Sequence, residues 1–220
     1  MAYWAALVIF PSRNYAKKKH AVRAKPESVL IMKAEKQIYQ IKIVLEGSKP
    51  PIWRRIIVSS DTNLSKLHDI IQIVMGWEDG HLHQFRTDDG IYGTPDNDMD
   101  SVFGPKSLNE KNYKLGHLLR TVNDKMAYEY DFGDDWQHKI TLEKILPFEN
   151  KEKLPKCIGG KMCCPPEDCG GLWGYYDLLE AIQDEENSEH DSMLEWLGEE
   201  FDPEYFDVDE VNIVLAKYLK

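Results

Sequence analysis

The strongest constraint on the fold is a pair of alternating segments, residues 126–132 and 136–142, separated by a short turn. Every second residue in each segment is apolar or aromatic, except for one histidine. Strands with one buried face have this period, because successive side chains point to opposite faces. The sequence therefore predicts a β-hairpin with one aromatic-rich face, formed by Met126, Tyr128, Tyr130 and Phe132 on one strand and Trp136, His138, Ile140 and Leu142 on the other.

Further strands and one helix are expected before this hairpin. Residues 37–45 alternate and residues 52–58 are rich in β-branched side chains, so we expect them to pair as strands, with a third strand at 81–86. Between them, apolar residues recur with the 3.6-residue period of a helix that should be capped by Asp61 or Thr62 and end near Gly76.

The C-terminal part is expected to be helical, and the segment before it irregular. Helical patterns cover residues 175–184, 188–197 and 209–218, whereas no regular pattern follows Pro147 until the first of them. Strands that come first and helices that come last are typical of an α+β fold. We expect a two-layer, mostly antiparallel sheet with helices packed on one face, forming a single domain over residues 37–220.

Residues 1–36 differ from the rest of the chain. They hold eight Lys/Arg and two Glu, and no periodic pattern precedes Met32. The positive charges follow the short apolar start instead of preceding it, unlike a secretory signal. We expect a basic, dispensable leader, with translation starting at Met1 or at Met32. The alternative is a membrane-surface or nucleic-acid-binding arm built on Lys17–Lys19.

The remaining chain is acidic. The formal net charge of the whole chain is −11, although residues 1–36 are basic, and residues 184–210 contain thirteen Asp/Glu with no Lys or Arg. Such a run is either a solvated face or a surface that attracts a basic protein partner. A negative surface disfavours nucleic acid and anionic lipid. No run approaches the roughly 20 apolar residues of a membrane span, and no targeting signal is convincing, so we expect a cytoplasmic protein.

Four cysteines within thirteen residues form a candidate metal site. In a reducing compartment such a cluster favours thiol or metal chemistry over disulfides. Zinc takes four tetrahedral ligands and accepts thiolates. The predicted zinc ligands are Cys157, Cys164, Cys169 and His190, because the side chain of Cys163 should diverge from that of its neighbour. The alternative is a loop of buried thiols without an ion.

Three histidines form an alternative metal site. His81 and His83 are two residues apart and would share one face of a strand, and His138 lies on the aromatic face of the hairpin. If they converge, a metal-dependent hydrolase becomes conceivable, with Asp134 or Asp135 as a further ligand or base. The alternative is that each histidine is a hydrogen-bonded core residue.

The segment 165–171 is expected to form a rigid elbow. Two prolines fix its backbone, and Gly170 and Gly171 permit positive φ angles. Glu167 and Asp168 would then cap a helix that begins near Gly174.

Six motifs in order resemble the plasmid pRiA4b ORF-3-like family over residues 37–220. They are PPIWRR at 50–55, MGWEDGHLHQF at 75–85, the YG at 92–93, YEYDFGDDWQHKITLE at 128–143, the cysteine segment CxxG…CCPPEDCGG at 157–171 with the WGY after it, and EWLGEEFDPEYFD at 195–207. This resemblance implies a family without an established biochemical activity, so it assigns no catalytic residue.

The expected function is a non-enzymatic binding or adaptor module that engages a protein partner through its acidic C-terminal helices. The sequence contains no G-x-S-x-G elbow, P-loop or dinucleotide-binding glycine pattern. The metal-dependent hydrolase described above is the alternative.

Overall fold

A computed structural model describes residues 36–94, 107–148, 153–198 and 201–218. The predicted leader therefore lies outside the described residues, apart from Lys36. The elements in chain order are β1 (Gln37–Leu45), β2 (Trp53–Ser59), α1 (Leu64–Met75), β3 (His83–Thr87), β4 (Gly90–Gly93), β5 (Leu108–Asn109), the 3₁₀ turn η1 (Glu110–Asn112), α2 (Leu115–Leu118), β6 (Lys125–Tyr130), β7 (Trp136–Pro147), β8 (Lys156–Lys161), α3 (Gly171–Gln183), α4 (His190–Leu197) and α5 (Val208–Tyr218).

The strands form one open sheet in the order β5-β4-β3-β6-β7-β1-β2-β8. All neighbouring strands are antiparallel except β4 and β5, and this architecture confirms the predicted α+β class. The predicted hairpin is β6–β7, in which Tyr128 lies opposite His138 and Tyr130 opposite Trp136. The last aromatic residue of the predicted strand, Phe132, instead lies in the turn after β6 and is half exposed.

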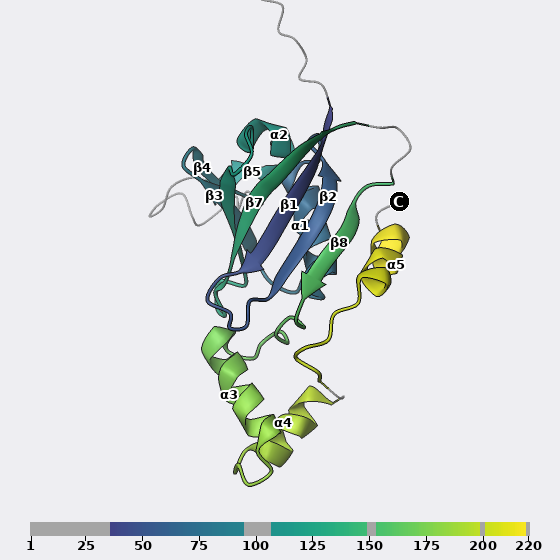
Figure 1. Cartoon of the computed structure of the whole chain (residues 1–220). Helices are drawn as coiled ribbons and strands as arrows, with labels where there is room; N and C mark the ends of the chain where they lie inside the picture. Colours follow the sequence, from purple (N-terminus) through teal and green to yellow (C-terminus); the bar gives the residue numbers. More distant parts are fainter. Residues whose placement is uncertain (1–35, 95–106, 149–152, 199–200, 219–220) are drawn as a thin grey trace, which may run out of the picture. The chain divides into compact units, whose positions relative to one another are not determined.

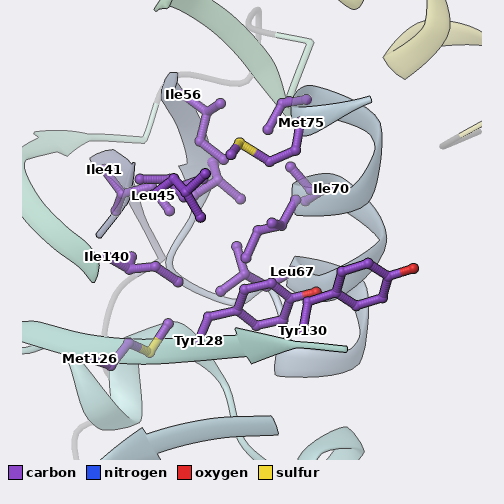
Figure 2. Close-up of a cluster of buried hydrophobic side chains, with 14 of the residues drawn as sticks. Ile41, Leu45, Ile56, Leu67, Ile70, Met75, Met126, Tyr128, Tyr130 and Ile140 are labelled. Carbon is purple, nitrogen blue, oxygen red and sulfur yellow. The ribbon is translucent and has the colours of Figure 1, made fainter. Parts of the chain in front are cut away.

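Helix α1 covers one face of the sheet and closes the core, and it lies behind the strands in Figure 1. Its apolar stripe meets side chains from β1, β2, β6 and β7, as Figure 2 shows for Leu67, Ile70, Ile41 and Ile140. The helix begins at an Asn63 cap, whose side chain accepts from the Lys66 amide, and ends at Gly76 with φ of 99°. The predicted caps Asp61 and Thr62 are therefore wrong by one or two residues, whereas the predicted end is correct.

Helix α5 lies beside the edge strand β8 (Figure 1). The Asn212 side-chain amide accepts from the backbone N–H of Cys157 at 2.8 Å and donates to its carbonyl at 2.9 Å. The amide therefore pairs with a strand edge that would otherwise be open to another chain. Strand β8 corrects the prediction that the chain is irregular from Pro147 to the first C-terminal helix.

Helices α3 and α4 form a pair near the ends of β1 and β7 (Figure 1). The Tyr176 hydroxyl accepts from the Lys49 amide at 2.6 Å, which ties α3 to the turn between β1 and β2. His190 at the start of α4 contacts the Ala181 carbonyl through Nδ1 at 2.9 Å. Within the described residues, no helix has the length and apolar character needed to cross a membrane.

Candidate functional site

Three loops meet where His81, Asp131 and Asp168 face one another. His81 precedes β3, Asp131 follows β6, and Asp168 precedes α3. The imidazole lies between the two carboxylates, with Nδ1 3.6 Å from Asp131 Oδ2 and Nε2 3.3 Å from Asp168 Oδ1. One ligand atom from each residue can be chosen so that all three lie within 4.8 Å of one another. We call these three residues the loop junction.

Hydrogen bonds beneath the loop junction hold the loops together. Tyr130 accepts from the Gly80 amide at 3.0 Å and donates to Glu167 at 2.7 Å, and the same carboxylate oxygen accepts from the Glu78 amide. Burial, together with the Glu167 carboxylate, raises the pKa of Tyr130, so the phenol remains a donor. The Trp77 indole donates to the Pro165 carbonyl and anchors the segment before Glu167.

These contacts correct the predicted role of the acidic pair. Helix α3 begins at Gly171, three residues before the predicted start, and its cap, Gly170, makes no side-chain capping hydrogen bond. Glu167 is instead bonded to Tyr130, and Asp168 faces His81. The positive φ angles predicted for the two glycines are confirmed, because Gly170 has φ of 88° and Gly171 of 68°.

Two stacked histidines lie in the core near the loop junction. The rings of His68 and His83 are parallel within 5°, with centroids 3.4 Å apart. Each ring has a carboxylate partner, Asp79 for His68 at 2.7 Å and Glu110 for His83 at 2.8 Å. Burial and the charge of His83 lower the pKa of His68. A proton added to His68 is therefore disfavoured in this stack.

His138 occupies a different, fully buried position. Its ring packs edge-on against Trp77 and near Tyr128, and its nitrogens make only weak contacts with the backbone of Tyr128 and Trp136, without a hydrogen bond of good geometry. Burial, with a smaller contribution from the Arg54 charge, lowers the pKa of His138 to about 4. The ring of His138 is therefore neutral in the folded protein at neutral pH.

The three histidines of the predicted alternative site are not brought together. His81 faces two aspartates, His83 pairs with Glu110, and His138 is enclosed by aromatic rings. His81 also precedes β3 and does not share a strand face with His83. Asp134 and Asp135 face elsewhere: Asp134 accepts from the Gly170 amide, and Asp135 accepts from the Gln137 side chain.

The predicted zinc ligands are spread over three elements. Cys157 lies on β8, Cys164 and Cys169 lie in the segment between β8 and α3, and His190 begins α4. Among the described residues they do not form a group of three ligand atoms within 4.8 Å. Burial raises the pKa of all three thiols, to about 12 for Cys169, where the Asp134 charge adds to the effect. Zinc would have to displace these protons, and its binding here stays a prediction.

A groove between α3 and α4 adjoins the loop junction. It has a volume of about 540 Å³, and Asp168 and Cys169 line its end next to the junction. Its apolar lining comes from Leu178 and Ala181 of α3 and from Met193 and Trp196 of α4. Its acidic residues are Asp168, Asp177, Glu180 and Glu189, and the lining includes no Lys or Arg.

Sequence reasoning missed Asp131 and Asp168 as partners of His81. The sequence does contain one indication that Asp131 is a functional residue: it lies directly after an alternating strand and before a glycine turn. Both aspartates have left-handed backbone, with φ of 54° for Asp131 and 59° for Asp168. This conformation is uncommon for residues other than glycine and turns each carboxylate toward the imidazole. No local pattern gives the distance between three loops that are far apart in sequence.

Comparisons with known proteins give relatives without a stated activity. A family model described as plasmid pRiA4b ORF-3-like protein matches residues 37–210. The uncharacterized protein y4hQ of Sinorhizobium fredii (strain NBRC 101917 / NGR234) is 35% identical over 162 residues, or 73% of this chain and 81% of that protein. The crystal structure of a protein of unknown function, MM3350 from Methanosarcina mazei Go1, matches with a TM-score of 0.71 at 40% identity. That match covers 80% of this chain and 97% of the other.

Proposed function

The chain belongs to the plasmid pRiA4b ORF-3-like family, and from its α3–α4 groove we propose that it is a non-enzymatic binding module for a basic, amphipathic segment of a partner protein. The observation that carries this proposal is the combination of an apolar lining and an acidic rim in one groove. Each property alone is common on protein surfaces, whereas together they match a segment with one apolar and one positive face.

The α4 side of the groove is accessible, whereas Leu178 and Ala181 of α3 are buried. No residue of α4 is buried, and Trp196 remains 48% exposed. Half-exposed aromatic side chains that line a groove are typical anchors of protein interfaces, because a partner can bury them without first unfolding anything. Met193 adds a flexible apolar side chain that adapts to different partners.

The negative charges of the groove favour a partner segment with positive charge. Asp177, Glu180 and Glu189 are exposed at its rim, and none of them forms an ion pair with Lys or Arg in the part of the chain that the structure describes. Acidic side chains repel the phosphates of nucleic acid and attract Lys or Arg, which steers association with a basic segment. A basic protein segment therefore fits better than nucleic acid.

Free thiols at Cys157, Cys164 and Cys169 are consistent with a reducing compartment such as the cytoplasm.

The test is a fluorescence-anisotropy titration of the full chain with a labelled peptide of about 15 residues, long enough to form an amphipathic helix of Leu and Lys. We expect saturable binding that weakens as salt is added. A peptide of the same pattern with Glu in place of Lys should not bind.

Two matched pairs of variants locate the binding. Glu180→Lys reverses a charge inside the groove, and Glu185→Lys makes the same change outside it. Trp196→Ala removes a groove side chain, and Trp173→Ala removes an exposed indole of α3 that does not line the groove. We expect about tenfold weaker binding for each groove variant, and no change for its control. Equal effects within the pairs, or binding of the Glu peptide, would contradict the proposal.

The alternative function, a metal-dependent hydrolase that uses His81, His83 and His138, has less support. Those side chains have separate partners and do not converge on one position. A hydrolytic metal centre requires ligands that surround a single ion and leave one position open for water.

A further inference from the structure

We propose that the loop junction of His81, Asp131 and Asp168 binds a divalent first-row transition-metal cation. This inference goes beyond the proposed function and does not depend on it. Its ligands would be one imidazole nitrogen and two carboxylate oxygens from three separate loops.

The distances at the junction are close to those of a metal site. The 3.3 Å between His81 Nε2 and Asp168 Oδ1 is about the separation of two ligand atoms on one ion, given ligand bonds of roughly 2.0–2.2 Å. Asp131 Oδ2 lies 3.6 Å from the other ring nitrogen, Nδ1, and a single ion would use only one of the two nitrogens. With one ligand atom taken from each residue, all three atoms lie within 4.8 Å of one another, so small side-chain movements would bring them around one ion. Asp168 is mostly exposed, so its side chain can adjust to complete the site.

Asp131 provides an independent sign of a ligand. Its side chain is only 10% exposed, although carboxylates are rarely buried without partners. Oδ1 accepts from the Gly133 amide at 2.9 Å, whereas Oδ2 faces His81 Nδ1 at 3.6 Å, which is longer than a hydrogen bond. A bound cation would give this largely buried oxygen a closer partner than the His81 ring provides.

The surroundings of the junction are negative. Asp131 and Asp168 face His81, Glu167 lies beneath them on Tyr130, and none of the three carboxylates forms an ion pair with Lys or Arg in the described part of the chain. Like charges this close destabilise one another, and a divalent ion relieves the repulsion.

The ligand types indicate the class of ion. Imidazole suits zinc, iron, nickel and copper, whereas carboxylate also suits manganese, and sites built from oxygen alone favour magnesium and calcium. A mixed set of one nitrogen and two oxygens therefore favours a first-row transition-metal cation over magnesium. Because Asp168 also lines the α3–α4 groove, the ion would lie at one end of that groove.

The test uses the full chain, freed of metal with a chelator and titrated with Mn²⁺ alone while free Mn²⁺ is followed by electron paramagnetic resonance. Mn²⁺ is the first probe because thiolates are poor ligands for it, so the cysteines do not contribute. A second titration uses Zn²⁺ with the Cys164→Ser variant, which removes a central ligand of the predicted cysteine site. We expect one saturable site in both titrations and much weaker binding of Mg²⁺.

The ligand variants are Asp131→Asn and Asp168→Asn. Asparagine tolerates the left-handed backbone and retains an acceptor oxygen, so the loops should keep their shape. Asp135→Asn is the matched control, since Asp135 also has positive φ, lies in the same turn as Asp131 and faces away from the junction. We expect at least about tenfold weaker Mn²⁺ binding in each ligand variant and no change in the control.

His81→Gln gives a third ligand variant if either asparagine variant fails to fold by circular dichroism. Two results would overturn the proposal: absence of saturable Mn²⁺ and Zn²⁺ binding in the wild type, or binding that the ligand variants leave unchanged. Peptide binding in the groove can succeed or fail in either case, so the two proposals are tested separately.

Discussion

His138 shows how a single residue in this fold can determine its sensitivity to acid. The ring is fully buried against Trp77 and Tyr128, and the guanidinium of Arg54 adds an unfavourable positive charge. The pKa of His138 is lowered from 6.5 to about 4 in the folded protein. As the pH falls below about 6.5, the unfolded chain takes up a proton that the folded chain does not, so stability decreases until about pH 4.

We therefore expect His138→Leu to reduce the loss of stability on acidification. The gap of about 2.5 pH units corresponds to about 3 kcal/mol at most. At neutral pH the variant should be no more than about 1 kcal/mol less stable, because it removes two buried ring nitrogens that have only weak contacts with the backbone. Urea unfolding between pH about 7 and about 4.5 measures the effect. If the free energy of unfolding decreases by the same amount in the wild type and the variant over that range, His138 does not titrate in this way.

At the scale of elements, the contact between β8 and the C-terminal segment depends on Gly160. A Cβ at this position would overlap the ring of Phe206, which itself stacks on the buried Arg54 guanidinium at 4.1 Å. Arg54 in turn donates to the carbonyls of Val74, Trp53 and Lys161. The small residue in the strand therefore allows one aromatic ring to hold the segment that leads into α5 against the sheet.

We expect Gly160→Ala to destabilise the protein by about 1–3 kcal/mol, because the added methyl displaces the ring of Phe206. Gly159→Ala is the control: it lies in the same strand, and its Cβ would meet Trp53 at an ordinary 3.7 Å. Denaturant midpoints of the two variants measure the difference. Similar midpoints would mean that Phe206 moves aside at no cost.

The secondary-structure elements show which parts of the fold can be predicted from the sequence and which cannot. The β6–β7 hairpin and α1 follow from local periods of two and 3.6 residues, and the helices of the C-terminal part were located within a few residues. Strand β8 was missed because its central Ile158–Gly160 has no alternation, and it is held by pairing with β2 and by Asn212 of α5. Its strand character comes from tertiary contacts, which a local pattern does not contain.

For the whole molecule, the sites arise where separate segments meet at the ends of strands. The acidic character of the C-terminal part was evident from composition, whereas the apolar groove required the packing of α3 against α4. Asp168 belongs to both the groove and the loop junction. The turn after β6, the loop before β3 and the elbow before α3 are distant in sequence, so their common position follows only from the sheet order.

The most direct test of the proposed binding module is amide hydrogen exchange of the full chain with and without the Leu/Lys peptide. A ligand that occupies the groove should slow exchange in α3 and α4, because binding suppresses their local opening. We expect this protection to be confined to residues around 174–197, with no change on the strands of the open sheet. Protection on the open face of the sheet, with α3 and α4 unchanged, would contradict the assignment of the groove as the binding site.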